Sequence, residues 1–415
     1  MNWKILSRKD KPNYDGVSLS KRSLRVFVKN KLALTSGIFI IIIGLISILG
    51  YLITPDDSPF ANSQMLEIAS RKPGFSVNCV LLKENKNHVR PSVFHKMLYG
   101  CEPEYQYIPF SSYRFDPPWM IIETYQDETE HDSIGVMYHL ADVAFALKEG
   151  EPIQWDSISR TMTFTAIDGE VITRSAEEIQ KIVEREHIKN RYFLLGTDRF
   201  GRDMLSQLII GARVSFSVGF VAVCISVIAG LFFGSLAGFF RGWVDDLILW
   251  FINVIWALPT LLLSMAITFA LGKGFWQVFV AIGLTMWVEV ARVARGQIIS
   301  IREKEYIEAT KALGLPFKNV IFRHVLPNIM GAVIVISAAN FASAILLEAG
   351  LSFLGIGVQP PMPSWGSMIK DHYGYIILDQ AYLAILPGLA IMLLVLAFMI
   401  FGNGLRDAMD SRSVK

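Results

Sequence analysis

The sequence predicts an all-α polytopic membrane protein with six transmembrane helices and an α+β domain inserted outside the cytoplasm between helices one and two. Apolar residues make up 52% of the 415 residues and charged residues only 18%, against about 25% in ordinary soluble domains. The apolar residues gather in long uncharged runs, and one long polar segment separates the first run from the others. This composition disfavours a cytosolic enzyme. The net charge of +2 gives no sign of a nucleic-acid partner.

The predicted transmembrane helices follow from the apolar runs. A bilayer core about 30 Å thick requires roughly 20 helical residues. The runs cover residues 34–53, 214–240, 247–271, 274–291, 325–348 and 380–405. Glu289 interrupts the shortest run and Glu348 ends another, so we expect both acids near a membrane interface. A proton- or sodium-coupled carrier would usually bury a charge in mid-span, so the energy for any transport should come from elsewhere.

Basic residues predict the orientation of the chain. Lys and Arg are concentrated in a leader at residues 1–33, a loop at 292–327 and a tail at 406–415. Since basic flanks stay in the cytoplasm, both termini and this loop are expected there, and residues 206–405 form the membrane core. The polar leader also disfavours the alternative that the first run is a cleaved signal peptide.

Residues 54–205 are polar and are predicted to form the inserted domain. Stretches rich in β-branched and aromatic residues predict strands at 75–82, 119–125 and 158–167. Ser175, followed by two acidic residues, predicts a capped helix that continues to residue 187. Cys79 and Cys101 both fall in this domain, and a disulfide and two free buried thiols are open alternatives.

Motifs for nucleotide binding or catalysis are not found. The chain has no G-x-x-x-x-G-K-[ST], G-x-S-x-G, H-E-x-x-H or C-x-x-C pattern. His131 and His139 share an acidic stretch, but their spacing defines no set of metal ligands, so a solvated charged face is favoured. We therefore expect no catalytic residue, no metal and no cofactor.

Residues 301–327 are predicted to form two short helices with a tight turn between them. The first half contains good helix formers through Leu313, and Gly314 can end that helix in a left-handed conformation. Pro316 suits the first turn of a second helix, because its missing N–H needs no partner there. Small side chains on the first helix would let a partner approach the turn closely. An ordinary amphipathic linker is the alternative.

The same loop resembles the EAA motif of ABC-transporter permeases. In that motif E-A-A is followed by a glycine and then by I-x-L-P. The matching residues here are Glu308, Ala309, Thr310, Gly314, His324, Leu326 and Pro327. Thr replaces the third Ala and His replaces the Ile, and neither change removes the turn. The resemblance implies that these residues, His324 excepted, form the coupling contact with an ATPase.

Three further segments resemble the branch of these permeases that imports dipeptides, oligopeptides and nickel. They are LGTDRFGRD at 195–203, GARVS at 211–215, and LSFLGIGVQPP at 351–361 with PSWG at 363–366. The last of them favours the second, C-type, peptide permease.

Two features depart from the family. Trp250 and Asn253 stand where members often carry an Arg and an Asp, and the segment at 54–205 is longer than the family's usual link.

The resemblance implies a non-enzymatic permease subunit of a binding-protein-dependent ABC importer for peptides, in the inner membrane of a bacterial cell. Its expected partners are a second homologous permease, two ABC ATPase subunits, an extracytoplasmic solute-binding protein and the lipid bilayer. The same machinery carrying nickel or another small solute is one alternative, and a membrane scaffold or sensor is a more distant one. The substrate-binding residues and the role of the inserted domain do not follow from the sequence.

Overall fold

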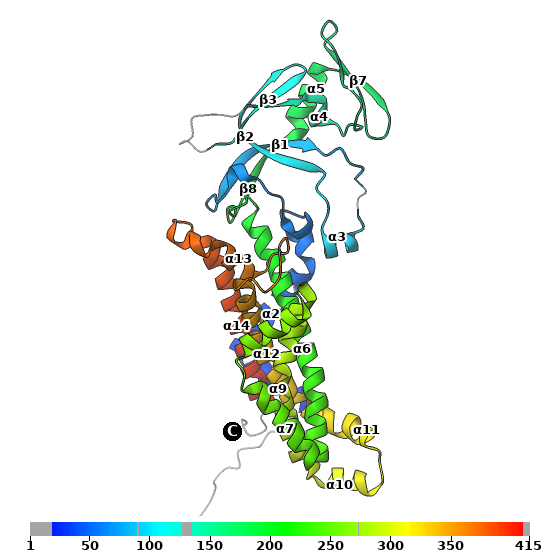
Figure 1. Ribbon diagram of the computed structural model, residues 1–415, viewed down its shortest axis with the longest axis vertical. Helices are drawn as coiled ribbons and strands as arrows, with labels where there is room; N and C mark the ends of the chain where they lie inside the picture. Colours follow the sequence, from blue (N-terminus) through cyan, green and yellow to red (C-terminus); the bar gives the residue numbers. More distant parts are fainter. Residues whose placement is uncertain (1–18, 89–90, 127–134, 273, 410–415) are drawn as a thin grey trace, which may run out of the picture.

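The structure is a computed structural model that describes residues 19–88, 91–126, 135–272 and 274–409. A long helical bundle carries a β-rich domain at one end, and a short helical hairpin lies at the other end (Figure 1). The long helix α6 (Met204–Phe240) leads from the β-rich domain into the bundle (Figure 1). A short helix, α1 (Leu19–Lys29), precedes the bundle in the sequence. Its Phe27 ring packs edge-on against the ring of Phe401.

The described residues include five helices that are long and apolar enough to cross a membrane. They are α2 (Lys31–Ile53), α6, α9 (Phe275–Arg302), the continuous stretch Phe317–Phe353 that ends in α12 (Leu326–Phe353), and α14 (Tyr382–Met409). The pair α7 (Trp243–Trp256) and α8 (Thr260–Leu271) makes a sixth span if it is counted as one. The chain is therefore a polytopic helical membrane protein, and its described residues supply five or six spans.

The predicted single helix over 247–271 is wrong, because α7 and α8 meet at an angle of 95°. The break falls at Ala257, Leu258 and Pro259, and Pro259 occupies the position just before α8. Proline lacks an N–H and its ring clashes with the preceding turn of a helix, and it also pushes the residue before it out of the helical region. The uninterrupted apolar run concealed this break.

The helix of the predicted fourth span does not end at residue 291. Helix α9 continues to Arg302, so residues 292–302 of the predicted loop are helical and Glu289 lies in the middle of the helix. The arginines beyond Glu289 are good helix formers, and two of them have partners on α7. Arg292 donates to the Asn253 side chain, and Arg295 forms a bidentate ion pair with Asp245.

Glycines on α6 let α9 pack closely against it. A Cβ added at Gly230 would lie 2.5 Å from a side-chain atom of Val290, and one added at Gly234 would lie 2.6 Å from the Ala291 carbonyl oxygen. Small residues allow such close approach in membranes, where the hydrophobic effect does not drive helices together. The α6–α9 pair is therefore closely packed.

The β-rich domain (residues 65–193) is built on an antiparallel sheet with the strand order β4-β3-β2-β1-β8. These strands are Gly135–His139, Trp119–Thr124, Tyr105–Asp116, Phe75–Lys83 and Ile188–Phe193. A smaller sheet contains β5 (Gln154–Asp156), β6 (Thr161–Thr165) and β7 (Val171–Ser175). Helices α4 (Leu140–Ala144) and α5 (Ala176–Ile182) pack against both sheets, and α3 (Val93–Tyr99) lies beside the C-terminal end of α2.

The predicted strands at 75–82 and 119–125 are confirmed as β1 and β3, while the predicted strand at 158–167 is shortened to β6. The predicted cap is also confirmed, since the Ser175 hydroxyl accepts a hydrogen bond from the Glu178 N–H, and a π-helical turn extends α5 to His187. Both thiols of the domain are free. Cys79 is buried, which raises its pKa to about 11, and Cys101 is partly exposed.

Candidate coupling site

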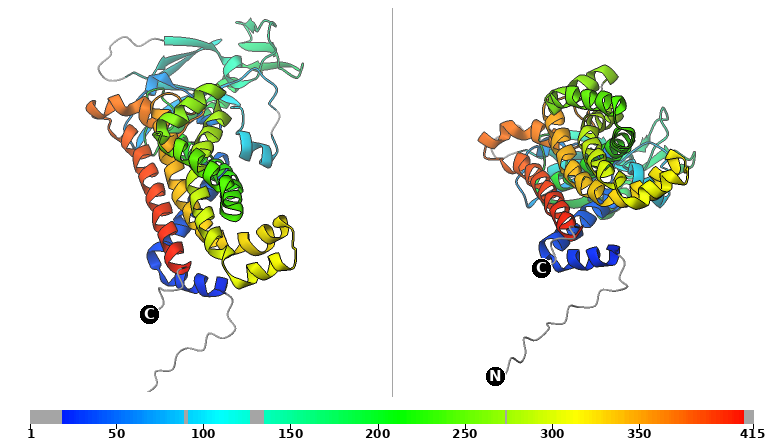
Figure 2. Two further views of the ribbon diagram at one scale, coloured as in Figure 1. Left: turned by 60° about the horizontal axis from the view of Figure 1, so that its bottom comes forward. Right: turned by 90° about the horizontal axis from the view of Figure 1, so that it is seen from below.

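The hairpin at the end of the bundle consists of α10 (Glu305–Ala312) and α11 (Phe317–Val320). The hairpin projects sideways from the end of the bundle that lies opposite the β-rich domain (Figure 2). Gly314 has a φ of 72°, and the backbone closes the turn through hydrogen bonds from Leu313 N to the Ala309 carbonyl and from Leu315 N to the Thr310 carbonyl. The predicted left-handed end of the first helix is thus confirmed.

The second helix of the hairpin begins as predicted but does not stop before the membrane span. The Pro316 carbonyl accepts hydrogen bonds from the backbone N–H groups of Asn319 and Val320, which starts α11. A π-helical turn over Ile321–Val325 then joins α11 to α12 without a break. A displacement of the hairpin would therefore act directly on a membrane-spanning helix.

An apolar cluster attaches the hairpin to the bundle. Ile307 of α10 is fully buried against α9 and the π-helical turn, in a cluster that also contains Ile298, Ile301, Val320, Ile321 and Val325. Thr310 faces the same way: it is buried, and its hydroxyl donates to the Ile307 carbonyl at 2.7 Å. Thr310 therefore supports α10 from inside and does not lie on the surface that a partner would contact.

The opposite face of the hairpin is exposed, and several of its side chains are apolar. Glu308 and Ala309 are exposed next to Thr310 on α10. Four large apolar residues are exposed on the hairpin and at its base, namely Tyr306, Leu313, Leu315 and Phe322. We call these six residues the coupling surface. Leu326 is half-buried and Pro327 is exposed where the hairpin continues into α12, away from the turn.

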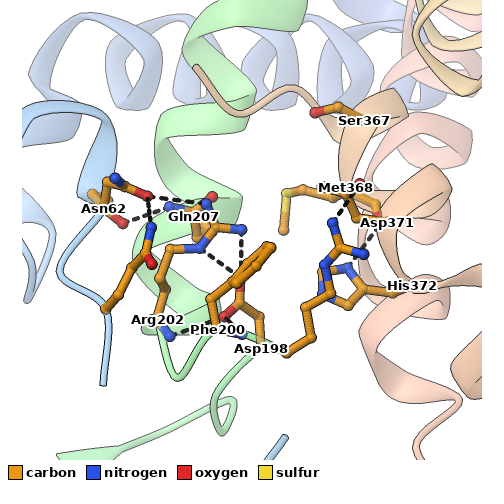
Figure 3. A network of polar contacts seen from close by, with 12 residues as sticks. Asn62, Asp198, Phe200, Arg202, Gln207, Ser367, Met368, Asp371 and His372 are labelled. Carbon is orange, nitrogen blue, oxygen red and sulfur yellow. Dashed lines mark hydrogen bonds and ion pairs between the residues drawn. The ribbon is translucent and has the colours of Figure 1, made fainter. Parts of the chain in front are cut away.

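The segment LGTDRFGRD forms a second polar site, between the β-rich domain and the bundle (Figure 3). Asp198 is almost fully buried and accepts hydrogen bonds from the backbone N–H groups of Phe200 and Arg202 and from the Arg202 guanidinium. Arg202 also donates to the Asn62 side chain at 3.2 Å. The Phe200 ring lies between two guanidiniums, that of Arg202 at 4.8 Å and that of Arg199 at 4.5 Å from its centroid.

Helix α13 (Trp365–His372) packs against this polar site from the other side (Figure 3). We call the polar site and α13 together the junction. Arg199 forms an ion pair with Asp371 at 3.1 Å. The neighbouring His372 is buried, with Nδ1 2.8 Å from the Met368 carbonyl oxygen, and burial lowers its pKa. Residues from before α6 and from between α12 and α14 thus meet, although more than 150 positions separate them in the sequence.

The other two resembling segments meet beside this junction at Glu348. This acid is fully buried in α12, and hydroxyl groups of Ser215 and Ser352 donate to its carboxylate at 3.3 and 2.7 Å. The backbone N–H of Trp365 donates to the Ser215 hydroxyl, and the Trp365 indole donates to the Leu208 carbonyl. Glu348 lies near the end of α12, as expected, and its contacts serve to hold α6, α12 and α13 together.

The sequence could not show that Asn253 has a partner on another helix. Its side-chain oxygen accepts a hydrogen bond from Arg292 at 2.8 Å, and the same guanidinium stacks 3.7 Å from the Trp256 ring centroid.

The acidic stretch with His131 lies outside the described residues, whereas His139 precedes α4 and its ring accepts a hydrogen bond from the Ala141 N–H. Within the described ranges no three His, Cys, Asp or Glu side chains gather as a metal site would require.

The bundle, the hairpin and the junction define a polytopic helical membrane protein. Residues 230–415 match the family described as binding-protein-dependent transport system inner membrane component. Residues 18–70 match the N-terminal transmembrane domain of oligopeptide transport permease C. Most of the β-rich domain lies between these two matches, outside both.

Several curated proteins align with about half of the chain. The dipeptide transport system permease protein DppC of Alkalihalophilus pseudofirmus is 41% identical over 217 residues, which cover 52% of this chain and 71% of that protein. The di/tripeptide transport system permease protein DppC of Pseudomonas aeruginosa is 42% identical, with 53% and 72% covered. The glutathione transport system permease protein GsiD of Pectobacterium atrosepticum is 37% identical, with 52% and 72% covered.

Among solved structures, the MetNI methionine ABC transporter in an inward-facing conformation matches 49% of this chain and 97% of its own chain, with 18% identity and a TM-score of 0.42.

From the sequence matches, the chain belongs to the family of inner membrane components of binding-protein-dependent transport systems. It is a permease subunit of an ABC importer and not an enzyme, because ATP hydrolysis resides on separate subunits of these transporters.

Proposed function

We propose that this chain is the C-type permease of an ABC importer that moves di- or oligopeptides across the cytoplasmic membrane of a bacterial cell. The observation that carries this proposal is the alignment of about half of the chain with permeases named for dipeptides, di/tripeptides and glutathione. The match of residues 18–70 to the oligopeptide permease C type supports the same assignment. The chain would supply half of the membrane pathway, and a second homologous permease would supply the other half.

The coupling surface is proposed to contact an ABC ATPase subunit in the cytoplasm. Exposed apolar side chains such as Leu313 and Phe322 are typical of a protein–protein contact, and Ala309 leaves room for close approach. Because α11 is continuous with α12, a movement of the ATPases on binding ATP would tilt a membrane span. ATP can drive such a change only if it binds one conformation better than the other.

This assignment also orients the chain in the membrane. The hairpin and the β-rich domain lie at opposite ends of the bundle (Figure 1). If the hairpin meets cytoplasmic ATPases, both termini are cytoplasmic and the β-rich domain lies outside, on the side where a solute-binding protein delivers its cargo. The junction around Asp198 would then hold the β-rich domain rigidly on the outer end of the pathway.

Reconstitution tests the proposed function. The chain, its partner permease, the two ATPases and the binding protein are placed in proteoliposomes with a library of di- to pentapeptides, and uptake is followed by mass spectrometry. We expect uptake that requires ATP and stops when the ATPases carry a substitution of their catalytic acid. Uptake of Ni²⁺ without uptake of any peptide would contradict the proposal.

A further inference from the structure

A hollow of about 280 Å³ lies where the α7–α8 break meets α9 and α12. Its lining includes Trp256, Thr285, Glu289 and Ser343. A separate, larger hollow of about 720 Å³ lies between α9, α12 and α14, with Val293 and Gln297 of α9 in its wall. Since residues four apart lie on one face of a helix, Thr285, Glu289, Val293 and Gln297 make a single stripe along α9.

Glu289 is the acidic side chain of this stripe, and it faces the hollow without a partner. Among the residues that the structure describes, no hydrogen bond or ion pair is formed by its carboxylate, and the side chain is exposed. The two nearest arginines along α9 are engaged elsewhere, Arg292 with Asn253 and Trp256, and Arg295 with Asp245. The acid lies 14 residues after the start of α9 and 13 before its end.

A carboxylate without a partner half-way along a membrane-spanning helix is costly, and such groups usually mark a pathway for an ion or a substrate. A cation that enters the hollow would supply the missing partner. Every unmodified peptide carries one cation whatever its side chains are, namely its amino-terminal ammonium. The apolar part of the wall, which includes Ile255, Leu263 and Leu346, suits side chains of varied peptides.

We propose that Glu289 binds the amino-terminal ammonium of the transported peptide at the α7–α8 break. This inference rests on the proposed peptide function and assigns a substrate contact to that pathway. Recognition of the backbone terminus would let one site accept peptides of many sequences while excluding solutes without a cation. The other occupant to be tested is a basic side chain of the partner permease.

The test uses the purified complex of both permeases and both ATPases without the binding protein, because a binding protein has a selectivity of its own. Binding of trialanine and of N-acetyl-trialanine is measured by calorimetry for the wild type, Glu289→Gln, Glu289→Asp and the control Glu303→Gln. The control removes an acid just after the end of the same helix, outside the hollow. Uptake of the peptide library is measured in parallel for the same variants with the binding protein present.

We expect the wild type and Glu303→Gln to bind the free peptide at least tenfold more tightly than the acetylated one. Glu289→Gln should lose this preference, and Glu289→Asp should keep most of it. An unchanged preference in Glu289→Gln overturns the inference while leaving peptide transport intact. Separation of the two permeases in Glu289→Gln also overturns it, because the acid would then pair across the subunit interface. Absence of peptide uptake by the wild type overturns the proposed function as well.

Discussion

Substitution of Gly314 by valine isolates the coupling hairpin from the rest of the fold. Gly314 has a φ of 72°, and a Cβ at this position would meet no atom within 4 Å. The cost is therefore backbone strain alone. A left-handed conformation costs an L-residue about 1–2 kcal/mol, and the cost is higher for a β-branched side chain. A value of about 2 kcal/mol corresponds to a roughly 30-fold shift from the ordered to the disordered turn.

The assay compares the Gly314→Val transporter with a matched control, Gly169→Val. Gly169 has a φ of 88° and equally open surroundings, but it lies in the β6–β7 turn of the β-rich domain. Both variants should reach the membrane at wild-type levels. Only Gly314→Val should lose substrate-stimulated ATP hydrolysis several-fold and release the ATPases in detergent. Full retention of ATPase binding and stimulation in Gly314→Val would refute the assignment of the hairpin.

The other predictions concern orientation, the junction and the β-rich domain. In a chain whose three native cysteines are replaced by serine, an impermeant thiol reagent on intact cells should label Gln126→Cys but not Lys311→Cys, and labelling of the latter would reject the orientation proposed here. Arg202→Ala should destabilise the protein by about 3 kcal/mol in thermal melts, because it leaves the buried Asp198 carboxylate without its ion-pair partner. Arg199→Ala removes the half-exposed ion pair with Asp371 and should cost about 1 kcal/mol or less. Burial lowers the pKa of His187 from its ordinary value of 6.5, so the unfolded chain binds protons more readily. The isolated β-rich domain should melt cooperatively, and its stability is therefore expected to fall as the pH drops below about 6.5. His187→Gln should reduce this pH dependence. A pH-independent melt of the wild-type domain would contradict the prediction.

The sequence allowed the spans and the hairpin turn to be predicted because both depend on local signals. Apolar runs identify membrane helices, and Gly314 identifies a left-handed turn. The bend at Pro259 and the continuation of α9 beyond Glu289 were missed for opposite reasons. A proline inside an apolar run could have been read as a breaker, whereas the partners of Arg292 and Arg295 on α7 follow only from the packing of two helices.

The contacts among distant segments could not be predicted from local patterns. Asp198, Ser215 and Trp365 each lie in a segment recognised from the sequence, yet their partners come from other elements. The orientation of Thr310 is another example, because helix periodicity alone does not tell which face of a short helix packs inward. Only the buried cluster around Ile307 shows that Ala309 and Glu308 are exposed and Thr310 is not.

Cross-linking at Ala309 tests the central claim, that this permease is driven through its hairpin, most directly. Ala309→Cys is introduced after the three native cysteines are replaced by serine, and a short bifunctional reagent is added to the assembled transporter. The account predicts a cross-link to the ATPase subunit whose yield changes when ATP binds, and no such product from a control cysteine at Ile158 in the β-rich domain. Absence of a cross-link at Ala309, in complexes that still contain the ATPases and import peptides, would contradict it.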